Sequence, residues 1–299
     1  MSSELTGPVA IVAHDAGGAE VLSSYVARNR IPCRLVLDGP AVKIFERKLG
    51  AITLTPLQDA IKMVNSLLCG TSGEAELEWQ AIAAARAAGK PVIAFLDHWV
   101  NYRKRFIRGG LENLPDAIWV GDATAEAIAR KVFPETLVQR VPNPYFEDIR
   151  QELSELEHAP EPPERLALRV LFVCSPVKDK VSTGYTEFDA LRYFFSSRAV
   201  LGKPIASMVI RPHPSEEPDK YRSIVAEFGE GVRLGGDKPL LMEIAESDVV
   251  AGCSSMAMVV ALVAGRRVIS AIPPGGRASS LPQPDIESLQ ALREQADCR

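Results

Sequence analysis

Short apolar, β-branched runs alternate with helix-forming stretches along the whole sequence, and no other feature constrains the fold as strongly. In the first half the expected strands are residues 9–13, 33–37, 63–69, 92–96, 117–120 and 138–141. In the second half they are residues 169–174, 206–211, 232–234, 248–251 and 268–271. Helix-forming stretches such as 74–88, 123–132 and 254–264 separate these strands. Because strands joined through helices make right-handed crossovers, the sequence predicts an α/β fold with parallel sheets.

A change in composition separates the two halves. Residues 147–157 are charged and helical, and the following segment His158–Glu164 is polar and rich in proline, which is typical of a linker. We therefore predict one Rossmann-like domain at residues 1–145, an interdomain helix and linker at 146–166, and a second Rossmann-like domain at 167–275. A C-terminal tail with a helix is expected at 276–299. Two such domains are expected to face a cleft and to bind ligands beyond the carboxyl ends of their strands.

Composition excludes several classes of function. The 34 basic and 38 acidic side chains give a net charge of −4, which argues against bulk binding to nucleic acid. The longest apolar stretch, residues 249–265, is shorter than the roughly 20 residues of a membrane helix, and the N-terminus does not resemble a signal peptide. The five cysteines include no CxxC pair, so we expect reduced thiols, no structural zinc and a cytoplasmic protein.

A histidine between two prolines follows the strand 206–211. Proline restricts its own φ and holds the preceding residue extended, so His213 is expected to be fixed rigidly at the carboxyl end of that strand. There it can donate a hydrogen bond to a phosphate, and Arg211 can add a bidentate donor. The alternative is a rigid exit loop in which His213 is merely polar.

A serine pair follows the strand 248–251 and opens the next helix. Gly252 and Cys253 form the turn, and Ser254 and Ser255 stand where the helix starts. Free backbone N–H groups and the positive end of the helix dipole make such a start an anion site. The alternative is that the serines simply cap the helix. Since both loops follow strands of one parallel sheet, we predict that His213 and the two serines bind the same phosphate.

The Arg211-Pro212-His213-Pro214 motif, followed by Ser254-Ser255, resembles the HP and SS motifs of bacterial GT-B glycosyltransferases. These include sialyltransferase-like and Kdo-transferase-like enzymes with CMP-activated acidic sugars, and capsule polymerases with CDP-linked donors. The resemblance implies that the second domain binds a nucleotide sugar and that the first binds a glycan or small-molecule acceptor, in polysaccharide biosynthesis. It also implies that His213, Ser254 and Ser255 hold the donor phosphate. UDP-linked epimerases and sugar hydrolases share this architecture.

The same resemblance places a catalytic acidic residue after a strand of the first domain. Here Asp97 and His98 follow the strand 92–96 and are both catalytic candidates, with Asp97 as the candidate general base, because an acceptor hydroxyl must lose its proton. The sequence departs from the family motif, since His98 stands where glycine or aspartate is expected. The alternative is a polar surface loop with a capping aspartate.

Aromatic and basic side chains follow this acidic residue. Trp99 and Tyr102 are candidates for stacking on a sugar face, and Arg103 and Arg105 are candidates for binding an acidic sugar or a phosphorylated acceptor.

Further polar residues follow other strands. Asp15, after the first strand, is the alternative base, and Gly17 and Gly18 are expected to contact the acceptor or the donor, unless they only allow a tight turn. Lys178 is a candidate phosphate ligand, although a solvated run of charges is the alternative. No cluster has the spacing of metal ligands, so we expect a metal-independent reaction with the nucleotide sugar as co-substrate and no further cofactor.

Three functions remain open at this point. The first is a GT-B glycosyltransferase, the second a sugar-nucleotide epimerase or hydrolase, and the third a non-catalytic protein that binds nucleotides or glycans. The sequence does not indicate the oligomeric state.

Overall fold

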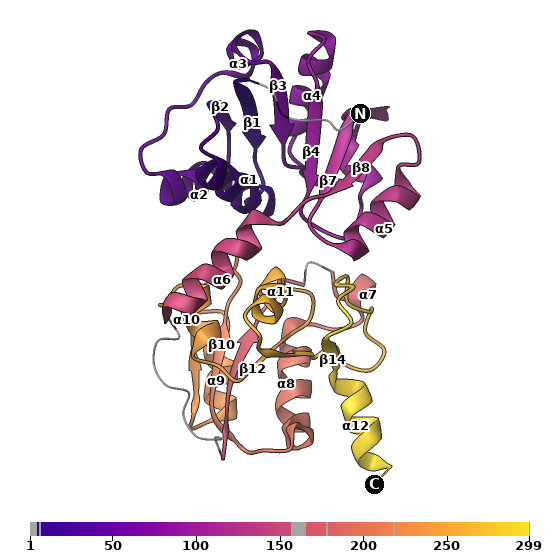
Figure 1. The fold of residues 1–299 in the computed structure, drawn as a ribbon. Coiled ribbons are helices and arrows are strands. Elements are labelled where there is room, and N and C mark those ends of the chain that lie inside the picture. The colour runs from indigo at the N-terminus through magenta and orange to yellow at the C-terminus, as the bar shows by residue number, and fades with distance from the viewer. Residues whose placement is uncertain (1–4, 6, 157–165, 178, 218, 299) are drawn as a thin grey trace. The chain divides into compact units, whose positions relative to one another are not determined.

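The computed structural model describes residues 5, 7–156, 166–177, 179–217 and 219–298. The chain divides into two compact units, Met1–Asp148 and Ile149–Arg299. Each unit contains a six-stranded sheet whose strand pairs are all parallel (Figure 1). The predicted α/β class with two Rossmann-like domains is therefore confirmed. The proline-rich segment His158–Glu164 and Lys178 lie outside the described residues.

The first sheet has the order β2-β1-β3-β4-β7-β8. Its strands are β1 (Val9–Ala13), β2 (Cys33–Leu37), β3 (Ser66–Cys69), β4 (Val92–Leu96), β7 (Ala117–Val120) and β8 (Leu137–Arg140). Strands β1, β3, β4 and β7 are buried at every position, because helices cover a parallel sheet on both faces. The chain reverses its direction of winding between β1 and β3, and ligands bind beside such a point in doubly wound sheets.

The helices of the first unit are α1 (Ala16–Asn29), α2 (Pro40–Leu49), α3 (Leu57–Met63), α4 (Leu77–Ala87), α5 (Ala123–Val132) and α6 (Pro144–Leu156), which runs on into the second unit. Sequence reasoning did not predict α2 and α3. A 3₁₀ turn, Arg103–Phe106, and a small hairpin of β5 (Ile107–Arg108) and β6 (Leu111–Glu112) follow β4. Gly109 and Gly110, with φ of +55° and +80°, form the two-residue turn that such a hairpin requires.

The second sheet has the order β11-β10-β9-β12-β13-β14, in which the winding reverses between β9 and β12. Its strands are β9 (Leu168–Val173), β10 (Ile205–Arg211), β11 (Val232–Leu234), β12 (Val249–Gly252), β13 (Arg267–Ser270) and β14 (Ile286–Ser288). The helices are α7 (Lys180–Thr183), α8 (Glu187–Ser197), α9 (Arg222–Phe228), α10 (Leu240–Ala245), α11 (Met256–Val263) and α12 (Leu289–Asp297). Strand β14 was not predicted, and it extends the second sheet into the segment that the sequence assigned to a tail.

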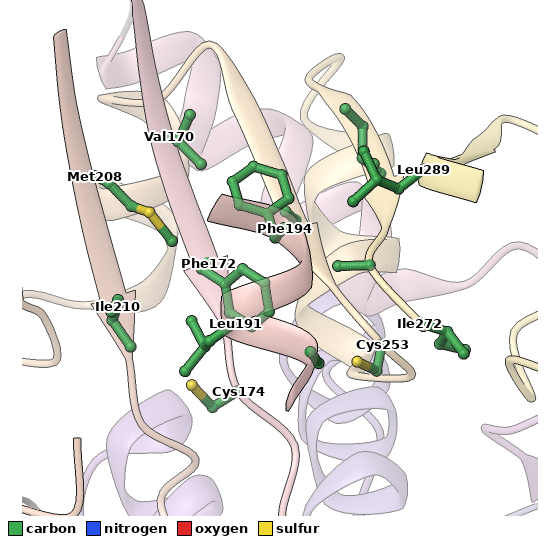
Figure 2. Close-up of a cluster of buried hydrophobic side chains, with 14 of the residues drawn as sticks. Val170, Phe172, Cys174, Leu191, Phe194, Met208, Ile210, Cys253, Ile272 and Leu289 are labelled. Atoms are coloured by element: carbon green, nitrogen blue, oxygen red, sulfur yellow. The ribbon is translucent and has the colours of Figure 1, made fainter. Parts of the chain in front are cut away.

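Apolar side chains from β9, β10 and α8 fill the core on one face of the second sheet. Figure 2 shows Phe172 and Phe194 beside each other in this core, and their ring centroids are 5.6 Å apart in an edge-to-face arrangement. Cys174 and Cys253 pack in the same cluster as free thiols. Such a packed core holds the strand ends, and therefore the loops that follow them, in fixed positions.

Among the described residues, no helix combines the length and the apolar character that crossing a membrane would require.

Candidate functional site

Three loops leave the carboxyl edge of the first sheet at the same level. Val12 of β1 pairs with Cys69 of β3, and Cys69 pairs with Ala94 of β4, so these residues form one row across the sheet. The residues three positions beyond this row are Asp15, Ser72 and Asp97. The sheet therefore brings two carboxylates and a hydroxyl to one edge, beside the point where the winding reverses.

Asp15 is held by hydrogen bonds from two neighbours. Ser72 Oγ donates to Asp15 Oδ1 over 2.9 Å, and His14 Nδ1 lies 2.8 Å from the same oxygen. The backbone N–H of His14 donates to the buried carboxylate of Glu78 over 2.7 Å. Although Asp15 stands at the N-cap position of α1, its side chain makes no capping hydrogen bond. Its carboxylate is thus bound to the loop after β3.

Asp97 is almost completely buried, with 7% of its side chain exposed. Its Oδ1 has no hydrogen-bond partner within the described part of the chain, and the Arg105 guanidinium lies 3.9 Å away. Burial raises the pKa of Asp97, and the nearby Asp15 raises it further, while Arg105 and His98 lower it in part. A carboxyl group with a raised pKa and an oxygen free of hydrogen bonds from the described residues is suited to taking up or releasing a proton.

Two glycines of α1 let the backbone approach this group closely. A Cβ on Gly17 would lie 2.0 Å from Asp97 Oδ2, and a Cβ on Gly18 would lie 3.2 Å from the Cα of Gly70. The structure therefore gives both glycines a packing role. No contact with an acceptor or donor is needed to explain them.

His98 and Tyr102 add two further polar atoms at the end of β4. His98 Nδ1 and the Tyr102 hydroxyl are buried without a hydrogen-bond partner among the described residues. Burial lowers the pKa of His98, although the neighbouring Asp97 raises it in part. Burial also raises the pKa of Tyr102 well above its usual range. Buried polar atoms without partners are rare in proteins and point to a bound ligand or water.

The predicted stacking platform is not present in this structure. Trp99 and Tyr102 are only 7% and 3% exposed, because both rings pack inside the fold, and Trp99 Nε1 donates to Asp122 over 2.9 Å. Neither ring offers an open face to a sugar.

The two predicted arginine ligands are also engaged within the first unit. Arg103 pairs with Glu112 at 2.8 Å, and Arg105 donates to the carbonyl and hydroxyl oxygens of Thr71, each over 3.2 Å. These arginines hold loops together, and Arg105 in addition influences Asp97.

The second sheet presents a corresponding row. Val173 at the end of β9 pairs with Arg211 of β10 on one side and with Gly252 of β12 on the other. Two positions beyond this row stand Ser175, His213 and Ser254. The histidine and serine loops therefore leave the same edge of the sheet, separated by one strand, which corresponds to about 10 Å between the outer strands.

A network of hydrogen bonds holds the loop of His213. The carboxylate of Glu216, 3% exposed, accepts the backbone N–H of His213 over 2.9 Å. Its other oxygen accepts the hydroxyl of Tyr221 over 2.8 Å and the ammonium of Lys220 over 2.7 Å. Because Tyr221 is fully buried, the loop is tied to the core.

The two serines of the second loop have different roles. Ser255 is the N-cap of α11, and its hydroxyl accepts the backbone N–H of Ala257 over 3.3 Å, which confirms the capping interpretation for this residue. Ser254 instead lies 3.2 Å from the hydroxyl of Ser279, and it accepts the backbone N–H of Ser280 over 3.4 Å. The chain after β13 thus folds onto the serine loop.

Arg211 has a structural partner. Its guanidinium donates to Glu243 over 2.6 Å and to the carbonyl oxygen of Lys238 over 2.9 Å, and Glu243 is 1% exposed. The predicted bidentate contact of Arg211 with a phosphate would compete with this buried ion pair.

Sequence reasoning did not assign Glu78 or Glu216 to these sites. Glu78 lies on the face of α4 that carries the buried residues Ala81, Ile82 and Ala85, and an acidic residue on the apolar face of a helix is a usable signal. Glu216 is only one of several charged residues after Pro214, and the pattern does not distinguish it from the exposed ones.

No family model and no curated protein matches this sequence. Similarity to solved structures is clear. UDP-GlcNAc 2-epimerase from Neisseria meningitidis has a TM-score of 0.60 and 12% identity, with 97% of this chain and 90% of that chain covered. UDP-GlcNAc 2-epimerase from Methanocaldococcus jannaschii has a TM-score of 0.58 and 11% identity, with 97% of this chain and 92% of that chain covered. The glycosyltransferase SnogD from Streptomyces nogalater has a TM-score of 0.50 and 12% identity, with 90% and 82% covered. These similarities confirm the GT-B type of fold.

Proposed function

We propose that this protein is an enzyme that acts on a sugar nucleotide. The observation that carries the proposal is the buried carboxyl group of Asp97 at the ligand-binding edge of a parallel sheet, with a raised pKa and an oxygen that no described residue hydrogen-bonds. Similarity to structures of glycosyltransferases and UDP-GlcNAc 2-epimerases supports the substrate class.

The proposal gives the two units separate tasks. In the second unit, His213, Ser254 and the N-terminal end of α11 bind the phosphates, because backbone N–H groups and neutral donors at a helix start stabilise negative charge. In the first unit, Asp97 moves a proton, and Asp15 is the second carboxylate near it. Preorganised donors at the phosphates then stabilise the charge that develops on the leaving nucleotide.

The first candidate reaction is glycosyl transfer. The HP and SS motifs favour it, with a CMP-linked acidic sugar as one donor to test. Asp97 would then accept the proton of the acceptor hydroxyl as the glycosidic bond forms.

The second candidate is epimerisation. An epimerase must remove a proton at one carbon and return one, and Asp15, Asp97 and His98 supply more acid–base groups than a single deprotonation needs. Neighbours crystallised with UDP-GlcNAc make this nucleotide sugar the donor to test for epimerisation.

The test begins with a calorimetric screen of CMP-, CDP- and UDP-linked sugars, followed by turnover assays with and without an acceptor. Product that forms only with an acceptor indicates a transferase, and an epimerised or hydrolysed donor without acceptor indicates the second candidate. We expect His213→Ala to weaken nucleotide binding by about tenfold or more, which is the cost of losing a hydrogen bond to a charged group. Tight binding without turnover of any donor would contradict an enzymatic function.

A further inference from the structure

The side chain of Ser215 contacts the ring of His213 in a way that determines where the ring proton sits. Ser215 Oγ lies 2.8 Å from His213 Nδ1, and the backbone N–H of Ser215 donates to the same nitrogen over 3.2 Å. A hydroxyl can donate or accept, but a backbone amide always carries its hydrogen. Nδ1 must therefore be the acceptor in this pair of contacts.

The alternative protonation states conflict with this geometry. A proton on Nδ1 would point into the region where the Ser215 N–H hydrogen lies, so two donors would face each other. The neutral ring with its proton on Nε2 has no such conflict, because Nδ1 then offers its lone pair to both donors. In this state the second ring nitrogen, Nε2, is the only donor that the ring has left.

We propose that Ser215 is a positioning residue that fixes His213 as the neutral Nε2–H tautomer, so that His213 binds its ligand as a neutral hydrogen-bond donor and not as a cation. The identity of that ligand as a phosphate rests on the proposed function. The protonation state of His213 is independent of the proposed function.

The surroundings of the ring agree with a neutral histidine. Burial lowers the pKa of His213, and the carboxylate of Glu216 raises it in part. Lys220 pairs with this carboxylate and with that of Glu187, so the carboxylate nearest the ring is itself engaged in an ion pair. With the backbone of His213 held by Glu216, neither the loop nor the ring needs to reorganise on binding.

A fixed Nε2–H has a consequence for recognition. A neutral donor keeps its hydrogen bond as the pH rises above neutrality, whereas an imidazolium loses its charge there. Each phosphate of UDP-GlcNAc carries one ester bond and one anhydride bond, so its single negative charge is constant in this range. We therefore expect the affinity of the protein for UDP-GlcNAc to stay constant from about pH 7 to pH 8.5, a range above the usual histidine pKa of about 6.5.

The direct test uses ¹⁵N NMR of the histidine rings in the ligand-free protein at neutral pH. The chain has four histidines, and the signals of His213 are assigned by their loss in His213→Gln. We expect one protonated nitrogen at Nε2 and one unprotonated nitrogen at Nδ1. A protonated Nδ1, or two protonated nitrogens, would overturn the proposal.

Two variants separate the hydroxyl of Ser215 from general effects on the loop. Ser215→Ala keeps the backbone N–H that donates to Nδ1 but loses the 2.8 Å contact, so we expect Nε2–H to stay the major tautomer of His213 with a smaller excess over the Nδ1–H form than in the wild type. Ser215→Thr retains a hydroxyl and should restore the wild-type signals. Ser196→Ala is the control, because Ser196 is exposed and, within the described part of the chain, its hydroxyl donates to the carbonyl oxygen of Tyr193. Unchanged His213 signals in Ser215→Ala would refute the role of the hydroxyl.

Binding of UDP-GlcNAc is measured separately on the same variants. If it binds, Ser215→Ala should weaken it about threefold to tenfold, the range for one neutral hydrogen bond. If His213 of the wild type lacks the Nε2–H tautomer but the protein binds UDP-GlcNAc, the inference is refuted and the proposed function stands. If His213 of the wild type has the Nε2–H tautomer but the protein binds no nucleotide sugar, the proposed function is refuted and the inference stands.

Discussion

Replacing Gly17 by alanine would place a methyl group against the carboxylate of Asp97. The new Cβ would lie 2.0 Å from Oδ2 and 3.2 Å from Cγ, whereas real Cβ atoms essentially never come closer than 3.0 Å to such a neighbour. The backbone of α1 is held by the helix, so Asp97 is the group that must move, by about 1 Å. A shift of about 1 Å in a reacting group costs on the order of 100-fold in rate.

The effect on stability should be much smaller than the effect on rate. Alanine is preferred to glycine within a helix by about 1 kcal/mol, while a steric clash in a packed site costs about 1–3 kcal/mol. These two contributions oppose each other. We therefore expect the free energy of unfolding of Gly17→Ala to fall by no more than about 2 kcal/mol.

The assay compares turnover and urea unfolding of Gly17→Ala with those of Gly73→Ala. Gly73 follows the neighbouring strand and is exposed, and a Cβ added to it would meet no described atom within 4 Å beyond its chain neighbours, so its substitution should change neither quantity. A Gly17→Ala protein with wild-type turnover would show that the position of Asp97 does not matter for the reaction.

Two further substitutions probe buried charges. Burial raises the folded-state pKa of Asp97, so the wild type loses stability as the pH rises from the unfolded-state value of about 3.9 toward the folded-state pKa. Asp97→Asn should therefore have a higher Tm than the wild type near pH 7, with a difference that shrinks toward pH 4; a lower Tm at pH 7 would contradict this. Arg211→Ala leaves Glu243, 1% exposed, without its cationic partner and should destabilise the protein by about 3–5 kcal/mol in urea unfolding. Arg192→Ala, which removes an exposed ion pair with Glu227, should change stability little, and equal effects of the two arginine substitutions would refute the argument.

The sequence predicted the sheets well because their central strands are continuous apolar runs. β1, β4 and β7 have the predicted bounds, since runs of four or five consecutive apolar residues between turn signals are too short for a typical helix and fit a buried strand. Helix α2 was missed although the sequence carries usable signals for it, because apolar residues recur at helical spacing between Pro40 and Gly50. Strand β14 was missed because its three residues, Ile286–Ser288, include a single apolar side chain and lead directly into α12.

The candidate site was predictable by position and much less by contact. The sequence shows that polar residues follow β1, β4, β10 and β12. The parallel topology then brings those after β1 and β4 to one edge of the first sheet, and those after β10 and β12 to one edge of the second. The partners of those residues are set by tertiary packing. Nothing in the sequence indicates that Arg211 pairs with Glu243, 32 residues away, or that the ring of Trp99 turns inward toward Asp122.

The outer strands of the two sheets have a consequence for solubility. β2, β8, β11 and β14 end the sheets, and apart from one bridge between Leu35 and Leu54 the described residues add no further strand beside them. Such edges invite pairing between molecules. Each of the four strands is short, at five, four, three and three residues, and each carries a charged side chain: Arg34, Arg140, Arg233 and Glu287. A second molecule that added a strand there would gain few hydrogen bonds and would have to bury a charge, so these borders protect the protein from aggregation through its sheets.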